Sequence, residues 1–193
     1  MRKNNYKTVW GTYTLVMLGV LVAMTIVLSR VLAIDLGFAR FTLGSVCTIM
    51  AGLWFGPLSG AVCGFAADLL GCLIKGYAVN PLITVAAMLW GVIPALARPL
   101  ISGGKVKKAA ILSASVVATS IVCTMGFTYA GLVLILGYNF YAILPTRLAQ
   151  FAAMTPVYCV LTCCLYFSPV TSLVNGELAR QEGRKEVKLT SER

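Results

Sequence analysis

The sequence predicts an all-α integral membrane protein, and three observations support this fold class. Of its 193 residues, 59% are hydrophobic and 11% are charged, whereas soluble domains are roughly 45–50% apolar and about 25% charged. The apolar runs suffice for about six membrane-spanning helices of roughly 20 residues. The cations lie in the tails and between these runs. We expect one membrane domain over residues 1–193, with a cytoplasmic N-terminal segment (1–13), a six-helix bundle (14–167) and a cytoplasmic tail (168–193).

The first three helices are expected at residues 14–32, 41–54 and 57–74. The first apolar run is too long for a signal peptide and lacks a small-residue cleavage site, so we interpret it as a retained helix. The second helix ends at a Gly-Pro turn, and Pro57 fits the first turn of the third, where its missing amide hydrogen would be unsatisfied anyway. On the third helix, small residues recur every three or four positions and share one face with Asp68. These residues are Gly60, Gly64, Gly71 and Cys72.

The last three helices are expected at residues 81–96, 109–136 and 145–167. Asn80 and the proline after it begin the fourth. The fifth is long and rich in small residues, and we expect it to tilt or break near Gly126. The sixth begins at Pro145, after an aromatic interfacial loop. After residue 168 the sequence is polar and of mixed charge, which is typical of a frayed surface helix.

The distribution of the 16 Lys and Arg residues predicts the orientation of the bundle. Three lie in the N-terminal segment, four between the fourth and fifth helices and five in the tail. With six spans these all fall on one side, so the positive-inside rule places both termini in the cytoplasm. The other four lie at the opposite ends of helices, and they are Arg30, Arg40, Lys75 and Arg147.

These four cations predict a ligand pocket at the outward end of the bundle. Asp68 is placed among small and apolar residues, and a carboxylate at such a position is a candidate functional residue. Guanidinium groups bind carboxylates, aromatic rings stack on a flat heterocycle, and amides add hydrogen bonds. The further candidates are Tyr77, Asn80, Tyr138, Tyr141 and Gln150. In the alternative interpretation, the cations extend to lipid head groups and Asp68 pairs with one of them.

The composition argues against several other classes of protein. The chain has no histidine, one carboxylate within its spans and no phosphate-binding glycine loop, so we expect no enzyme and no cofactor. Its seven cysteines lie in apolar runs without paired spacing, which argues against a metal site. The cations are not clustered on one surface, so the net charge of +10 does not indicate nucleic-acid binding.

Several segments resemble one family of membrane proteins. They include LWFGPLSGAVCGFAADLLGCL (residues 53–73), NPLITVAAMLWGVIPAL (residues 80–96) and LPTRLAQFAAMTPVY (residues 144–158). Together they are similar to the folate-type substrate-binding S component of energy-coupling factor (ECF) vitamin transporters. The most specific pieces are the Gly-Pro turn with Asp68 downstream and the Pro-x-Arg sequence that ends at Arg147.

The resemblance implies a multi-pass protein of the bacterial plasma membrane that captures a vitamin on its outer face. Its partners would be a transmembrane coupling protein and two cytoplasmic ATPase subunits, which use the ATP. Arg40 and Arg147 would hold the ligand, and Gly19 and Ala23 would form the small-residue face toward the coupling protein. Alternatives are a sister vitamin (thiamine, riboflavin or a queuosine precursor) and a structural or regulatory membrane subunit.

Overall fold

The computed structural model describes residues 11–35, 40–76, 78–101, 103–135, 137 and 139–191, without the side chains of 34, 35, 40, 140 and 182–191. Its helices are α1 (Thr12–Ile26), α2 (Gly44–Phe55), α3 (Pro57–Lys75), α4 (Pro81–Ala97), α5 (Lys105–Ser120), α6 (Tyr129–Leu134), α7 (Phe140–Phe167) and α8 (Pro169–Ser191). Two π-helical segments, η1 (Val27–Val31) and η3 (Ile121–Thr128), and the 3-10 turn η2 (Arg98–Leu100) extend them. The strands β1 (Ile34–Asp35) and β2 (Arg40–Phe41) pair antiparallel.

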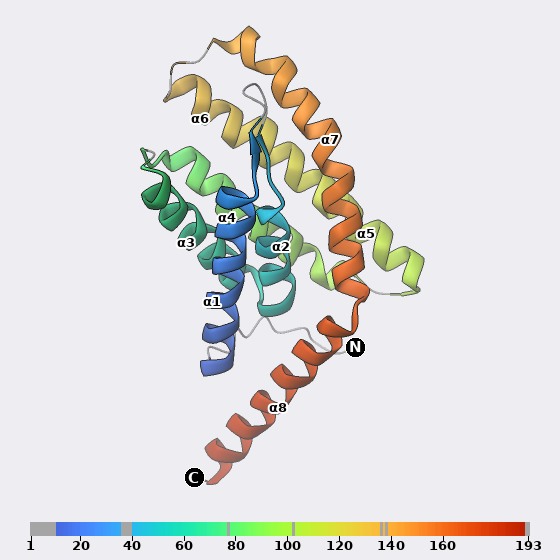
Figure 1. The fold of residues 1–193 in the computed structure, drawn as a ribbon. Helices are drawn as coiled ribbons and strands as arrows, with labels where there is room; N and C mark the ends of the chain where they lie inside the picture. The colour runs from blue at the N-terminus through green and yellow to red at the C-terminus, as the bar shows by residue number, and fades with distance from the viewer. Residues whose placement is uncertain are drawn as a thin grey trace.

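Among the described residues, five helical stretches are long and apolar enough to cross a membrane. They are Thr12–Val31, Pro57–Lys75, Pro81–Leu100, Lys105–Leu134 and Tyr141–Phe167. Helix α2 is apolar but shorter, and every residue in it except Ser45 is buried. A helix without a polar face is stable where neighbours cover it on all sides. The predicted multi-pass, helical membrane fold is thus present, with α2 at its centre (Figure 1).

Helices α2, α3 and α4 pack through glycine, as the small-residue face of α3 predicted. A Cβ atom at Gly60 would lie 2.8 Å from the carbonyl carbon of Gly91 on α4. A Cβ at Gly64 would overlap the carbonyl group of Ala87, and one at Gly52 on α2 would overlap that of Gly91. Because glycine has no Cβ atom at these positions, the helix backbones can approach one another closely, as is typical inside membranes. Asp68 is buried on the same face of α3, as expected.

The boundaries of two helices differ from the predicted ones. Helix α7 begins at Phe140 and not at Pro145, because the side chain of Asn139 caps it by accepting a hydrogen bond from the Tyr141 amide at 3.2 Å. Helix α5 begins at Lys105, four residues before the apolar run, so its lysines are helical. Hydropathy marks the part of a helix that lies in lipid, and a helix can extend beyond it. The expected irregularity near Gly126 is present as the π-helical segment η3.

The elements alternate in direction along the bundle (Figure 1). One end of the bundle, which we call the hairpin end, holds strands β1 and β2, the last residues of α3 and the first residues of α4 and α7. Helix α8 points away from the bundle at the other end. It is attached there by Trp54 on α2, whose indole Nε1 donates a hydrogen bond to Thr171 Oγ1 at 3.1 Å, and by the buried side chain of Val174.

Candidate functional site

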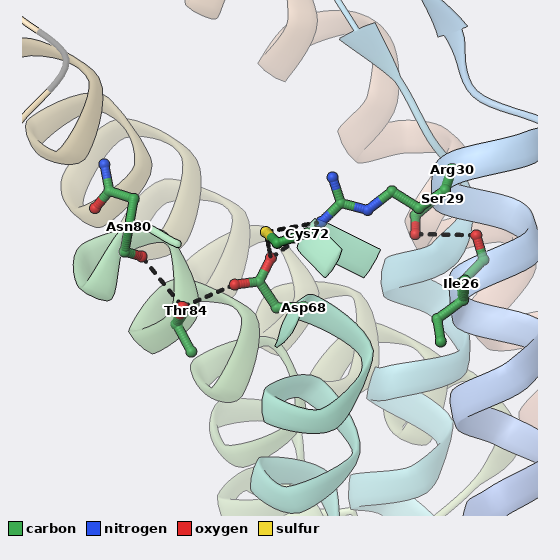
Figure 2. A network of polar contacts seen from close by, with 7 residues as sticks. All are labelled: Ile26, Ser29, Arg30, Asp68, Cys72, Asn80 and Thr84. Atoms are coloured by element: carbon green, nitrogen blue, oxygen red, sulfur yellow. Dashed lines mark hydrogen bonds and ion pairs between the residues drawn. The ribbon is translucent and has the colours of Figure 1, made fainter. Parts of the chain in front are cut away.

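Asp68 is the centre of a polar network that joins three helices (Figure 2). Its carboxylate is 9% exposed, and the Arg30 Nη2 atom lies 3.3 Å from its Oδ1 oxygen. The Thr84 hydroxyl on α4 donates a hydrogen bond to Oδ2 at 2.8 Å. The Cys72 thiol, one turn further along α3, lies 3.9 Å from Oδ1. A buried carboxylate needs such partners, because an unpaired charge is costly to bury.

The π-helical turn η1 brings Arg30 to this carboxylate from the end of α1. Its side chain is 12% exposed and passes over Gly71, where a Cβ atom would overlap the guanidinium. Nη2 also lies 3.6 Å from the Cys72 sulfur. The buried Nε atom has no hydrogen-bond partner among the described residues. Arg30 therefore has donor capacity beyond its contact with Asp68.

Asn80 and Thr84 connect the network to α6. The Asn80 side chain caps α4 by accepting a hydrogen bond from the Leu82 amide at 3.0 Å. Its Nδ2 group donates to the carbonyl of Gly131 on α6 at 2.9 Å. The Asn80 carbonyl accepts hydrogen bonds from the Thr84 amide at 3.0 Å and from the Thr84 hydroxyl at 3.1 Å. Asn80 is thus engaged within the protein as well as lying at the hairpin end.

The remaining predicted ligand-binding residues occupy varied positions. The half-buried Arg147 on α7 donates from Nη1 to Gln150 Oε1, one turn along the same helix, at 2.7 Å. Lys75, at the end of α3, is exposed, and Tyr141 is 81% exposed. Arg40 pairs with Asp35 through the backbone of the hairpin, while its side chain lies outside the described residues. Tyr77 and Tyr138 also lie outside them.

Sequence reasoning missed two members of the network. Cys72 was recognised as part of the small-residue face but not as a contact of Asp68. Thr84, one turn after the capping Asn80, was not recognised at all. The missing information was the pairing of α3 with α4, which no local pattern gives. That Asp68 pairs with a cation agrees with the alternative interpretation of the sequence, and Arg30 is that cation.

The geometry suits recognition of an anion. A guanidinium with unused donors binds carboxylates, and an ordered carboxylate beside it accepts hydrogen bonds from amino groups. Among the described residues, no three His, Cys, Asp or Glu side chains are grouped to hold a metal ion. The seven cysteines form no disulfide. Gly19 and Ala23 are exposed on α1, and a Cβ atom at Gly19 would meet nothing within 4 Å.

Comparison with known proteins identifies the family. The family model for the substrate-specific component of ECF transporters matches residues 13–173. The crystal structure of FolT bound with folic acid has a similar fold, with a TM-score of 0.67 and 22% sequence identity. That match covers 80% of this chain and 93% of the FolT chain. No curated protein sequence matches significantly. Since the family model spans most of the sequence and the fold agrees with it, this chain belongs to the substrate-specific components of ECF transporters.

Proposed function

We propose that this substrate-specific component binds folate or reduced folates with high affinity and delivers them to an ECF importer. The observation that carries the proposal is the partly satisfied Arg30 guanidinium beside Asp68 in a fold similar to that of FolT bound with folic acid. Folates combine carboxylates with a flat ring that carries an amino group. Arginine donors fit the former and a carboxylate fits the latter.

In this proposal, residues of the hairpin end and of the Asp68 network surround the ligand. The cations bind its acidic groups, Asp68 binds ring donors or orients the cations, and the amides and tyrosines contact the ring. The residues assigned to this site are Arg30, Arg40, Asp68, Lys75, Tyr77, Asn80, Tyr138, Tyr141, Arg147 and Gln150. The protein itself has no catalytic activity and needs no cofactor.

We further infer six passes through the bacterial plasma membrane, with both termini in the cytoplasm. The alternating direction of the helices in Figure 1 supports this topology. The short helix α2 is counted as a span in addition to the five longer ones. The partners are a transmembrane coupling protein and two cytoplasmic ATPase subunits. Gly19 and Ala23 form the face toward the coupling protein, which is supported by their exposure on α1.

Isothermal titration of the detergent-purified protein tests the ligand. Folic acid and 5-formyltetrahydrofolate are titrated beside thiamine and riboflavin. We expect one-to-one binding of the folates alone. Heat from thiamine or riboflavin instead would retain the family and replace the ligand. No heat of binding from any of the four ligands would favour a structural or regulatory subunit.

Arg147→Ala is expected to weaken folate binding roughly 10–100-fold, because one charge-assisted hydrogen bond is worth about 1.5–3 kcal/mol. The protein should remain folded, since the described partner of Arg147 is Gln150 on the same helix. Titration calorimetry measures the affinity, and Arg40→Ala is expected to behave in the same way.

Arg98→Ala is the matched control for both variants, because Arg98 lies at the opposite end of α4 from Asn80. Its affinity should equal that of the wild type. Unchanged affinity in both Arg40→Ala and Arg147→Ala would remove these two residues from the site.

A further inference from the structure

The two oxygens of Asp68 are divided between two helices. Oδ2 accepts the hydrogen bond from Thr84 on α4 at 2.8 Å. Oδ1 is left for Arg30 at 3.3 Å and for the Cys72 thiol at 3.9 Å. The carboxylate is 9% exposed, so few other groups can reach it. Thr84 and Arg30 thus contact different oxygens of the same carboxylate.

The contact between Arg30 and Asp68 is monodentate. Arginine and carboxylate groups often pair through two parallel hydrogen bonds of about 2.7–2.9 Å. Here one nitrogen, Nη2, contacts one oxygen, and the distance is longer. The buried Nε atom has no partner among the described residues. A second carboxylate oxygen would satisfy it, but the hydrogen bond from Thr84 keeps Oδ2 directed toward α4.

The hydroxyl of Thr84 is not required to complete α4. A hydroxyl donates one proton, and two acceptors lie near it, Asp68 Oδ2 at 2.8 Å and the Asn80 carbonyl at 3.1 Å. The charged and nearer carboxylate is the stronger acceptor. The Asn80 carbonyl also accepts from the Thr84 amide at 3.0 Å, so it keeps a partner without the hydroxyl. Removing the hydroxyl therefore leaves one oxygen of Asp68 without its donor.

We propose that Thr84 is a positioning residue that prevents Asp68 from binding Arg30 with both oxygens, and so keeps guanidinium donors available to an acidic ligand. Without the hydroxyl, Oδ2 turns toward Arg30 and the pair becomes bidentate. Asp68 then satisfies the donors of Arg30 and competes with an acidic ligand for them. This inference rests on the proposed function where it assigns an acidic ligand to Arg30.

Thr84→Val tests the inference, because valine keeps the shape of threonine and removes the hydroxyl. We expect folic acid to bind about tenfold more weakly, while the melting temperature of the ligand-free protein stays equal or rises. Thr84→Ser, which keeps the hydroxyl, should bind like the wild type. A melting temperature that falls together with the affinity would assign Thr84 a merely structural role and overturn the proposal.

The Asp68→Asn background supplies a second test. Asparagine cannot form the bidentate ion pair, so adding Thr84→Val there should change the affinity for folic acid no further. A tenfold additional loss would contradict the mechanism.

A measurement without ligand tests the role of Thr84 separately from the proposed folate binding. The NMR signal of the Arg30 Nε–H group should move downfield in Thr84→Val, as a new hydrogen bond forms. If the wild type fails to bind folic acid, the proposed function fails, and this signal still decides the inference. An unchanged signal in Thr84→Val overturns it.

Discussion

Arg30→Ala is expected to abolish most ligand binding and to destabilise the ligand-free protein. The variant leaves the carboxylate of Asp68 buried with Thr84 and Cys72 as its remaining contacts. Removing one partner of a buried ion pair typically costs about 3–5 kcal/mol, because the other charge stays buried. We expect a loss of about 3 kcal/mol in the free energy of unfolding. Chemical denaturation in detergent measures it, and titration with folic acid measures the affinity.

The double variant Arg30→Ala with Asp68→Ala distinguishes a structural from a binding contribution. It removes the unpaired buried carboxylate of Asp68, so its unfolding free energy should exceed that of Arg30→Ala. Its affinity for folic acid should remain low, because the guanidinium is still absent. Wild-type stability in Arg30→Ala would show that the ion pair contributes nothing to the fold.

Gly64→Val is expected to prevent folding of the bundle. Its Cβ atom would overlap the carbonyl group of Ala87 on α4, and a backbone atom cannot move aside as a flexible side chain does. Overpacking a core costs typically 1–3 kcal/mol and occasionally more, and here two helices must separate to accept the side chain. The expected result is an aggregated protein by size-exclusion chromatography, without a cooperative thermal transition.

Gly19→Val is the control for this substitution. A Cβ at Gly19 meets nothing within 4 Å, so the variant should fold and bind folate like the wild type. Reduced co-purification with the coupling protein is the one defect expected, because Gly19 is assigned to that interface. A folded Gly64→Val protein would contradict the close contact between α3 and α4.

The sequence predicted the fold through features that lipid imposes. The long apolar runs, the turn at Gly56, which has a φ of 100°, and the small-residue face of α3 are all present. Helix ends at the bilayer surface were harder to place. Hydropathy falls where the lipid ends, whereas the helix can continue beyond that point. Asn139, a capping residue, marks the start of α7 better than Pro145 does.

The polar network around Asp68 was predicted less completely than the fold. Asp68 and Arg30 were found because charge is rare within apolar runs, and such residues can be recognised one at a time. Thr84 could not be found in this way. Threonine is common in membrane helices, and its role depends on α4 lying against α3.

The direct backbone contact among α2, α3 and α4 has a consequence for dynamics. Few side chains lie between these helices at Gly60, Gly64 and Gly91, so rotamer changes cannot loosen them. We therefore expect the three helices to move as one rigid body. Helix α7 packs on α5 through side chains instead, among them Ser113 and Cys163, 3.6 Å apart. Small sliding motions are typical of helices packed through side chains. We therefore expect the microsecond-to-millisecond motions of this protein to occur in α7 and the segments near it.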